Sequence, residues 1–245
     1  MKAGFRLRGA GLTRLEGLTD AAFALALTYL VISLDAIPEN WPALVAALKQ
    51  MPAFAASFAV LLPIWALHVN WSRRYGLEDG AAIALTGVLI FAVLVFVYPL
   101  KIACASFFAW ISGGWLPPAM ALSSVEELRG QFVVFTGGYL VLGLAVAALY
   151  ALALGRSAAL ALDAYERHET VTELQACLLL AATGLHGLVW SLLLPAGWSF
   201  IGGMQFSLLG VVMPVHALWR ARLRPPCERL PTHPAAGAPS TSRTE

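Results

Sequence analysis

Charged residues are scarce in this chain, and their scarcity excludes most soluble folds. Asp, Glu, Lys and Arg make up 12% of the 245 residues, whereas 59% are hydrophobic. A soluble domain carries about 25% charged residues. The composition therefore predicts an integral membrane protein. The formal net charge of +2 is too small to suggest a nucleic-acid partner, and we expect none.

Cysteines and catalytic patterns are also sparse. The three cysteines, Cys104, Cys177 and Cys227, lack the paired spacing of a metal site, so we expect buried or inert thiols. The sequence shows no nucleophile–base set, metal cluster or nucleotide loop, and we expect neither enzyme activity nor a cofactor. The first apolar run is a full span without a cleavage pattern, so we expect no cleaved signal peptide.

Six apolar runs are long enough to cross a bilayer as helices. A transmembrane helix needs about 20 consecutive, predominantly apolar residues. We expect an all-α, polytopic membrane protein with six transmembrane helices, at about 16–36, 51–72, 80–101, 131–154, 174–195 and 198–219. These spans belong to a membrane domain at 14–222. A short basic tail at 1–13 precedes it, and a Pro/Ala/Ser/Thr-rich tail at 223–245, expected to be disordered, follows it.

Three connecting segments carry predictions of their own. Residues 41–50 are expected to form a short interfacial helix, with Trp41 at headgroup level. Residues 102–128 are expected to be the longest outer segment. Residues 156–173 are expected to be a polar loop or an amphipathic helix at the membrane surface.

The positive charges predict the orientation of the chain. Of the 16 Lys and Arg residues, only Lys49, Lys101 and Arg129 lie in segments predicted to be outside. The positive-inside rule therefore places both termini in the cytoplasm. The Ala/Leu/Arg-rich composition suggests a bacterial chain, and thus a multi-pass protein of the bacterial plasma membrane.

The first predicted span carries ionisable groups in its first turns. Asp20 lies about one turn inside the span, where an unpaired carboxylate is costly, and Arg14 and Glu16 are near it. The second span runs in the opposite direction, which puts His68 at about the same depth as Asp20. We therefore expect an Arg14–Asp20–His68 cluster, with Trp65 beside it, that satisfies these groups away from water.

One face of the first span carries a regular stripe. Steps of three and four residues connect the positions on this face: Leu18, Ala21, Leu25, Thr28, Ile32 and Asp35. The face is apolar, with a hydroxyl in its middle and an acid at its outer end. Asp20 points about 140° away from Leu25 and is expected to face packed protein. The spacing alone is compatible with ordinary helix packing or with the wall of a path through the membrane.

The start of the first span resembles the signature of a known family. Arg14-x-x-x-Leu18-Thr19-Asp20 is similar to the RxxxFSD motif that opens the first helix of the transmembrane protein 175 family of cation channels. Leu18 replaces the Phe of that motif and Thr19 replaces the Ser. Both changes are conservative, although Leu18 loses aromatic packing.

The second span extends the resemblance. Ser57-Phe58, followed by Trp65-x-x-His68, is similar to the SF…WxxH pattern of the same family. The six-span pattern and cytoplasmic ends also match, over about residues 10–220. Animal members carry two six-helix repeats, whereas this chain has one, as bacterial members do.

The resemblance implies a homotetramer in which four first helices surround a potassium-selective pore in the lipid bilayer. The family has no TVGYG-type filter loop, and this sequence has none. Its selectivity is attributed to rings of aliphatic side chains. The matching positions here are Leu25, as the narrowest ring, Thr28, and Ile32 toward the outer end. Tyr29 is bulky where the family has an aliphatic residue, which bears on the pore width.

These positions lead to a mechanistic hypothesis. Four Leu25 side chains form a dry neck that gates by wetting and dewetting. Asp35 at the outer mouth attracts monovalent cations. The foot residues Arg14, Asp20, Trp65 and His68 set the neck diameter, and the histidine could instead titrate and tune opening with pH.

Two other functions stay open at this point. A proton-permeable leak channel would use the same fold, because a dry neck can pass protons along transient water wires. A secondary transporter is disfavoured because the sequence shows no inverted repeat, and Pro63 and Pro214 are its only hints of broken helices.

Overall fold

The structure, a computed structural model, describes residues 5–9, 11, 13–32, 38–195, 198, 201 and 205–226. Helices dominate these residues. Their bounds are α1 Arg14–Ile32, α2 Trp41–Leu48, α3 Met51–Tyr75, α4 Gly80–Ile111, α5 Val125–Gly155, α6 Ala164–Leu193, the 3-10 turn η2 Gln205–Leu208, and α8 Leu209–Arg222.

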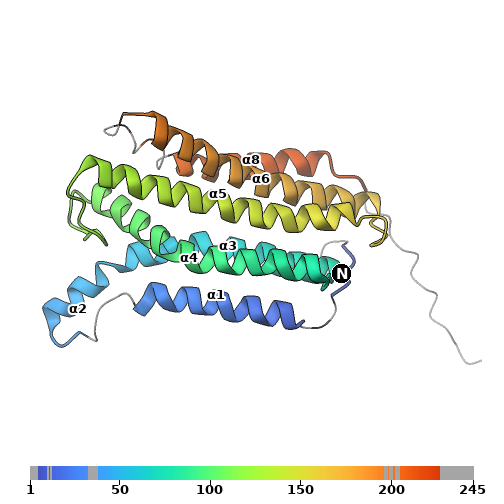
Figure 1. Ribbon diagram of the computed structural model, residues 1–245, viewed down its shortest axis with the longest axis horizontal. Helices are drawn as coiled ribbons and strands as arrows, with labels where there is room; N and C mark the ends of the chain where they lie inside the picture. The colour runs from blue at the N-terminus through green and yellow to red at the C-terminus, as the bar shows by residue number, and fades with distance from the viewer. Residues whose placement is uncertain are drawn as a thin grey trace, which may run out of the picture.

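The long helices lie side by side, with α1 at one edge of the bundle and α6 and α8 at the opposite edge (Figure 1). In the packing order, α1 contacts α3 and α4, α4 contacts α5, and α5 contacts α6 most extensively. The short helix α2 extends from one end of the bundle. The helix α8 contacts η2 and α6.

Polar side chains begin most of these helices. Asn40, Asp79, Ser124 and Asp163 cap α2, α4, α5 and α6, and each side chain accepts a hydrogen bond from a backbone N–H of the first turn. These bonds satisfy N–H groups that lack a partner within the helix. The caps therefore define where each helix starts.

Two glycines allow α5 and α6 to approach closely. A Cβ atom added at Gly143 would lie 2.6 Å from the backbone nitrogen of Ala181, and one at Gly184 would lie 2.6 Å from that of Leu140. Small residues at such contacts are typical of helix pairs in membranes.

Two buried aromatic side chains connect α3 to α5. The indole Nε1 of Trp71 donates to the carbonyl of Leu149 at 2.7 Å, and the hydroxyl of Tyr150 donates to the carbonyl of Leu67 at 2.9 Å. Both side chains are fully buried. These paired bonds fix α3 against the centre of the bundle.

Four helical stretches in the described part of the chain are long and apolar enough to cross a membrane. They are Trp41–Tyr75, which joins α2 and α3, and the helices α4, α5 and α6. The first predicted span falls on α1, which has 19 residues. The last falls on η2 and on α8, which has 14 residues. The chain is therefore an all-helical membrane protein with four such stretches among the described residues.

The helix ends differ from the predicted span ends. The helix α4 continues to Ile111 rather than ending near 101, so Lys101 lies inside it with only 9% of its surface exposed. The outer segment predicted at 102–128 shrinks to 112–124 because α5 already starts at Val125. Hydropathy marks the apolar layer, whereas a helix continues until its backbone bonds are capped.

The bounds predicted for the later segments also differ from the helix bounds in the structure, for the same reason. The helix α6 starts at Ala164, so most of the predicted surface segment at 156–173 forms its first turns. The last helix starts at Leu209, well after the predicted 198, and runs to Arg222. The short helix expected at 41–50 is present as α2, with Trp41 exposed. Residues 227–245 of the predicted tail lie outside the described residues.

Candidate functional site: the two faces of the first helix

The helix α1 has one buried face and one uncovered face. Phe23, Ala26 and Leu30 are buried against the rest of the chain. Leu18 and Leu25 are 58% and 48% exposed. The edge position of α1 in the bundle explains this division (Figure 1).

The stripe expected from the sequence lies on the uncovered face as far as it is described. Leu18, Ala21, Leu25 and Thr28 are all exposed. The side chain of Ile32 and the whole of Asp35 lie outside the described residues.

Thr28 contributes a hydroxyl with a defined direction. Its Oγ1 donates to the carbonyl of Ala24, one turn earlier, at 2.8 Å. Because the single hydroxyl proton is used within the helix, the oxygen lone pairs remain for a group outside it. An exposed oxygen of this kind can contact a cation but cannot donate to an anion.

Tyr29 flanks the stripe on the side of α4. Its ring centroid lies 6.1 Å from that of Tyr98 in α4, and the two rings are tilted. Tyr29 is 42% exposed. Its ring therefore partly leans on the neighbouring helix of the same chain.

The foot of α1 is fixed by two polar contacts to α3. The indole Nε1 of Trp65 donates to Oδ1 of Asp20 at 2.8 Å. The Nε of Arg73 donates to Oε1 of Glu16 at 3.0 Å, and Glu16 is only 2% exposed. Each carboxylate thus has a donor, as acids in an apolar setting require.

Thr13 and Thr19 complete the first turns of α1. The backbone N–H of Glu16 donates to Oγ1 of Thr13 at 3.0 Å, which caps the helix start. The hydroxyl of the fully buried Thr19 donates to the carbonyl of Leu15 at 2.9 Å. The Ser-to-Thr change in the motif therefore keeps a local hydroxyl bond.

His68 is fully buried, but it does not form the hydrogen bond that we expected. Its Nε2 lies 3.3 Å from Oγ1 of Thr86 in α4, and its Nδ1 has no partner among the described residues. Asp20 instead accepts a hydrogen bond from the indole Nε1 of Trp65.

Arg14 lies apart from this group. It is exposed and lines an open cavity of about 740 Å³ near the foot of α1, together with Arg8 and Glu78. No ion pair to Arg14 occurs among the described residues. The predicted Arg14–Asp20–His68 cluster is therefore corrected: Arg73 and Trp65 of α3 supply the donors to the α1 acids.

The sequence reasoning missed Arg73, Thr86 and the structural role of Glu16. Because Glu16 and Asp20 are four residues apart and share a helix face, the spacing could have indicated that both carboxylates face the same neighbouring helix. The long side chain of Arg73 could then have been considered as a donor. Thr86 sits in an apolar run and gave no signal.

A second polar cluster lies where residues 5–9, here the N-terminal strap, cross the ends of α3 and α6. Oε2 of the fully buried Glu166 accepts from Nη2 of Arg6 at 3.0 Å and from Nη2 of Arg8 at 2.6 Å. The hydrogen bond and charge of Glu166 raise the pKa of the Arg6 guanidinium above its ordinary value.

Close backbone contacts hold the strap in place. The N–H of Gly9 donates to the carbonyl of Arg73 at 3.1 Å. Gly76 has φ +60°, and a Cβ atom there would lie 3.1 Å from the carbonyl of Arg8. The strap thus leads directly into the foot of α1 and connects it to α6.

A hydroxyl chain joins the strap cluster to α3. The hydroxyl of Thr170 donates to the carbonyl of Glu166 at 2.7 Å, so it has no proton left for Tyr75. The hydroxyl of Tyr75 must therefore donate to Oγ1 of Thr170, at 2.7 Å. In the described part of the chain, no group of three His, Cys, Asp or Glu side chains could hold a metal ion.

Comparisons with known proteins agree with this architecture. The family model described as endosomal/lysosomal potassium channel TMEM175 matches residues 14–99, which include α1 and its contacts with α3 and α4. A potassium channel from Marivirga tractuosa is 34% identical over 199 residues, covering 79% of this chain and 80% of that relative. This chain belongs to the TMEM175 family. The chain is thus an ion-channel family member rather than an enzyme.

A solved structure extends the TMEM175 likeness over almost the whole chain. A crystal structure of a variant of the potassium channel MtTMEM175, in complex with a nanobody fusion protein, matches with a TM-score of 0.73 and 28% identity. The match covers 91% of this chain and 97% of the other. The TMEM175 likeness therefore includes the α6–α8 end as well as the helices matched by the family model.

Proposed function

We propose that this chain forms a potassium-selective channel as a homotetramer, with a pore lined by α1 and a neck at Leu25. The observation that carries the proposal is the uncovered stripe on α1. Its opposite face is fixed by buried side chains and by two polar contacts to α3. The matches to proteins named as potassium channels support the choice of ion.

The stripe combines an apolar side chain suited to a hydrophobic gate, Leu25, with the hydroxyl group of Thr28 one turn away. Leu25 side chains from four copies would form a constriction from which water is expelled when it is narrow. Thr28 lies one turn away, and its free lone pairs can replace part of the hydration shell of a cation. A proposed ring of Asp35 side chains at the outer mouth would raise the local concentration of cations.

The foot contacts give the neck a fixed frame. Asp20 and Glu16 hold the start of α1 against α3, and Trp71 holds α3 against α5. A change in the width of the neck would therefore require α1 to move relative to the bundle of α3 and α5. We also propose six spans with cytoplasmic termini, an orientation that the distribution of positive charges supports. We further propose a location in the bacterial plasma membrane.

Ion flux from liposomes tests the proposal directly. The purified protein is reconstituted with opposed potassium and sodium gradients, and a proton-sensitive dye is read in parallel. We expect potassium-driven flux that Leu25→Ala changes. Val31→Ala is the matched control, because Val31 is an exposed apolar residue of α1 outside the stripe.

Each other outcome contradicts a defined part of the proposal. Proton flux alone would keep the pore and reject potassium as its ion. Flux that saturates with substrate and couples to a second ion would indicate a transporter. Equal flux in Leu25→Ala and the parent would reject the neck at Leu25.

A further inference from the structure

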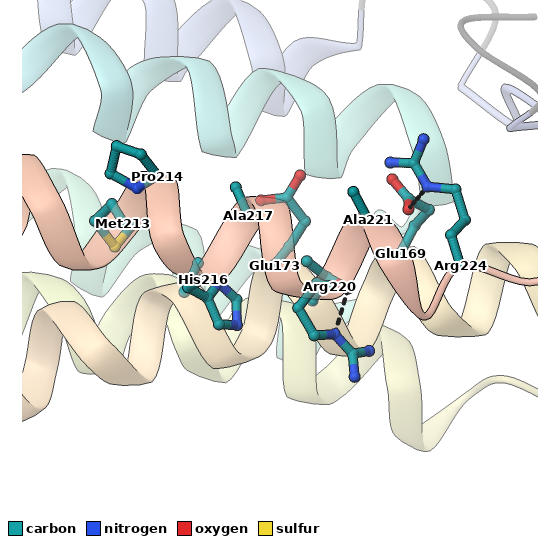
Figure 2. Close-up of a pocket in the computed structure, with 11 residues that line it drawn as sticks. Glu169, Glu173, Met213, Pro214, His216, Ala217, Arg220, Ala221 and Arg224 are labelled. Carbon is teal, nitrogen blue, oxygen red and sulfur yellow. Dashed lines mark hydrogen bonds and ion pairs between the residues drawn. The ribbon is translucent and has the colours of Figure 1, made fainter.

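A cavity of about 440 Å³ is lined by residues of α6 and α8 (Figure 2). These helices lie at the edge of the bundle opposite to α1 (Figure 1). Its volume is within the range of about 300 to 1,000 Å³ that is typical of ligand sites. Its lining includes Glu169, Glu173 and Ala176 on α6, Met213, Pro214, Ala217 and Arg220 on α8, and Arg224 just after α8. We call this cavity the α6–α8 groove.

The groove changes from apolar to charged along its length. Met213 and Pro214 lie at one end, and Glu169 and Arg224 lie at the other (Figure 2). Glu173 lies between them. The charged end coincides with the arginine-rich end of α8, where the positive-inside rule places the cytoplasmic surface. The groove therefore has the polarity of one lipid molecule in the inner leaflet.

The charges at this end are of both signs. Nε of Arg224 lies 2.9 Å from Oε1 of Glu169. Oε1 of Glu173 lies 3.4 Å from Nη1 of Arg74, and its other oxygen accepts no hydrogen bond among the described residues. One carboxylate of the groove is thus closely paired and the other keeps accepting capacity.

Arg220 retains donors on the other side of the groove. Its Nε donates to Oγ1 of Thr172 at 3.0 Å and its Nη2 to the carbonyl of His168 at 3.3 Å. These bonds orient the guanidinium while Nη1 has no acceptor among the described residues. Ala217 and Ala221, two small residues of α8, also line the groove (Figure 2).

We propose that the α6–α8 groove binds a zwitterionic phospholipid with a primary-amine headgroup. Its ammonium would donate to Glu173, its phosphate would accept from Arg220, and an acyl chain would run along Pro214 and Met213. An anionic lipid would place its net charge beside two carboxylates. A quaternary ammonium lacks the N–H donors that the free oxygen of Glu173 can accept.

Every residue of α8 keeps part of its surface exposed, so a lipid could enter the groove from the membrane side. The proposal does not depend on the channel function, because lipid binding can be measured without any flux.

Native mass spectrometry of the full-length, delipidated protein tests this site. Phosphatidylethanolamine, phosphatidylcholine and phosphatidylglycerol with identical acyl chains are titrated separately. We expect phosphatidylethanolamine to bind about tenfold more tightly than either of the others, the size expected for one hydrogen bond to a charged group. Equal binding, or a preference for phosphatidylglycerol, would overturn the proposal.

Three variants locate the binding. Glu173→Gln should remove the preference for the amine headgroup, and Arg220→Gln should weaken the binding of all three lipids because each carries a phosphate. Ala217→Trp should fill the groove and exclude all three lipids without changing a charge. The control is Arg222→Gln, which removes an arginine of α8 that does not line the groove.

The variants also separate lipid binding from other roles of the groove. The unfolding temperature of each variant is measured without lipid, and Ala217→Trp is replaced by Ala217→Phe if it fails to fold. Unchanged lipid binding in the Ala217 variant would show that the lipid sits elsewhere and would overturn the site. A shift to a smaller oligomer in that variant, with no lipid bound by the parent, would show that a second copy covers the groove.

Discussion

The two faces of α1 meet different physical demands within 19 residues. The inner face buries Phe23, Ala26 and Leu30 and carries the acids that bond to α3. The outer face leaves Leu25 and Thr28 exposed. The inner face determines where the helix stands, and the outer face is left for contacts from outside the chain. Substitutions on the inner face should therefore reduce the stability of the protein, whereas substitutions on the outer face should alter its function.

The largest effect is expected from Asp20→Ala on the inner face. The change removes the acceptor of the Trp65 indole and leaves that donor without a partner between helices. We expect a loss of about 2 to 3 kcal/mol in the free energy of unfolding. Denaturant unfolding in detergent, followed by Trp fluorescence, measures it. Asp20→Asn keeps an acceptor and should lose clearly less; equal losses would mean that the Trp65 bond does not hold the foot.

A comparable effect is expected at the buried seam between α5 and α6. Gly143→Ala places a Cβ atom 2.6 Å from the Ala181 nitrogen and should cost about 1 to 3 kcal/mol because backbone must move. Gly137→Ala is the matched control in the same helix, since nothing lies within 4 Å of its added Cβ. That control should be neutral or stabilising by about 0.5 to 1 kcal/mol. Identical unfolding curves for the two variants would mean that α5 and α6 do not pack so closely.

The positions of the helices could be predicted from the sequence, but their ends could not. Long apolar runs identify α3, α4, α5 and α6 because each must bury or face lipid with a continuous apolar surface. The charged residues before Glu173 hid the start of α6, which extends to the cap at Asp163. A polar stretch can continue a helix whenever a cap satisfies its first N–H groups.

The faces of α1 could be predicted for a related reason, whereas the partners of its acids could not. Helical periodicity alone decides that Leu25 and Thr28 share a face. Which donor reaches Glu16 depends on the rotation of α3 and on the length of the Arg73 side chain, which the spacing does not contain. The bond between His68 and Thr86 similarly requires the position of α4.

A smaller effect, confined to function, is expected from Leu25→Ala on the uncovered face. Shortening the side chain should widen and hydrate the proposed neck and raise potassium flux about tenfold, equivalent to about 1.4 kcal/mol in the barrier. The unfolding free energy should change little because Leu25 is 48% exposed and is not one of the buried core residues. Flux and unfolding are measured on the same preparation, with Val31→Ala beside it. A loss of stability without a change in flux would reverse the roles assigned to the two faces.

The smallest effect is expected at an exposed ion pair, which serves as a reference for the buried contacts at the foot. Asp79 caps α4 and pairs with Arg156, and the hydrogen bond from Arg156 lowers the pKa of Asp79.

A lowered pKa means that the carboxylate stabilises the fold above its ordinary pKa of about 3.9, and that this contribution disappears as the pH falls through the native value. Asp79→Asn should therefore be slightly less stable than the parent near pH 7, and the difference should disappear as the pH falls below the lowered pKa of Asp79. The side chains of Arg156 and Asp79 are 32% and 42% exposed, so about 1 M salt should also remove most of the difference, whereas the loss caused by Asp20→Ala should persist. Unfolding curves at two pH values and two salt concentrations distinguish the cases, and a salt-sensitive Asp20 variant would show that the foot of α1 is not shielded from water.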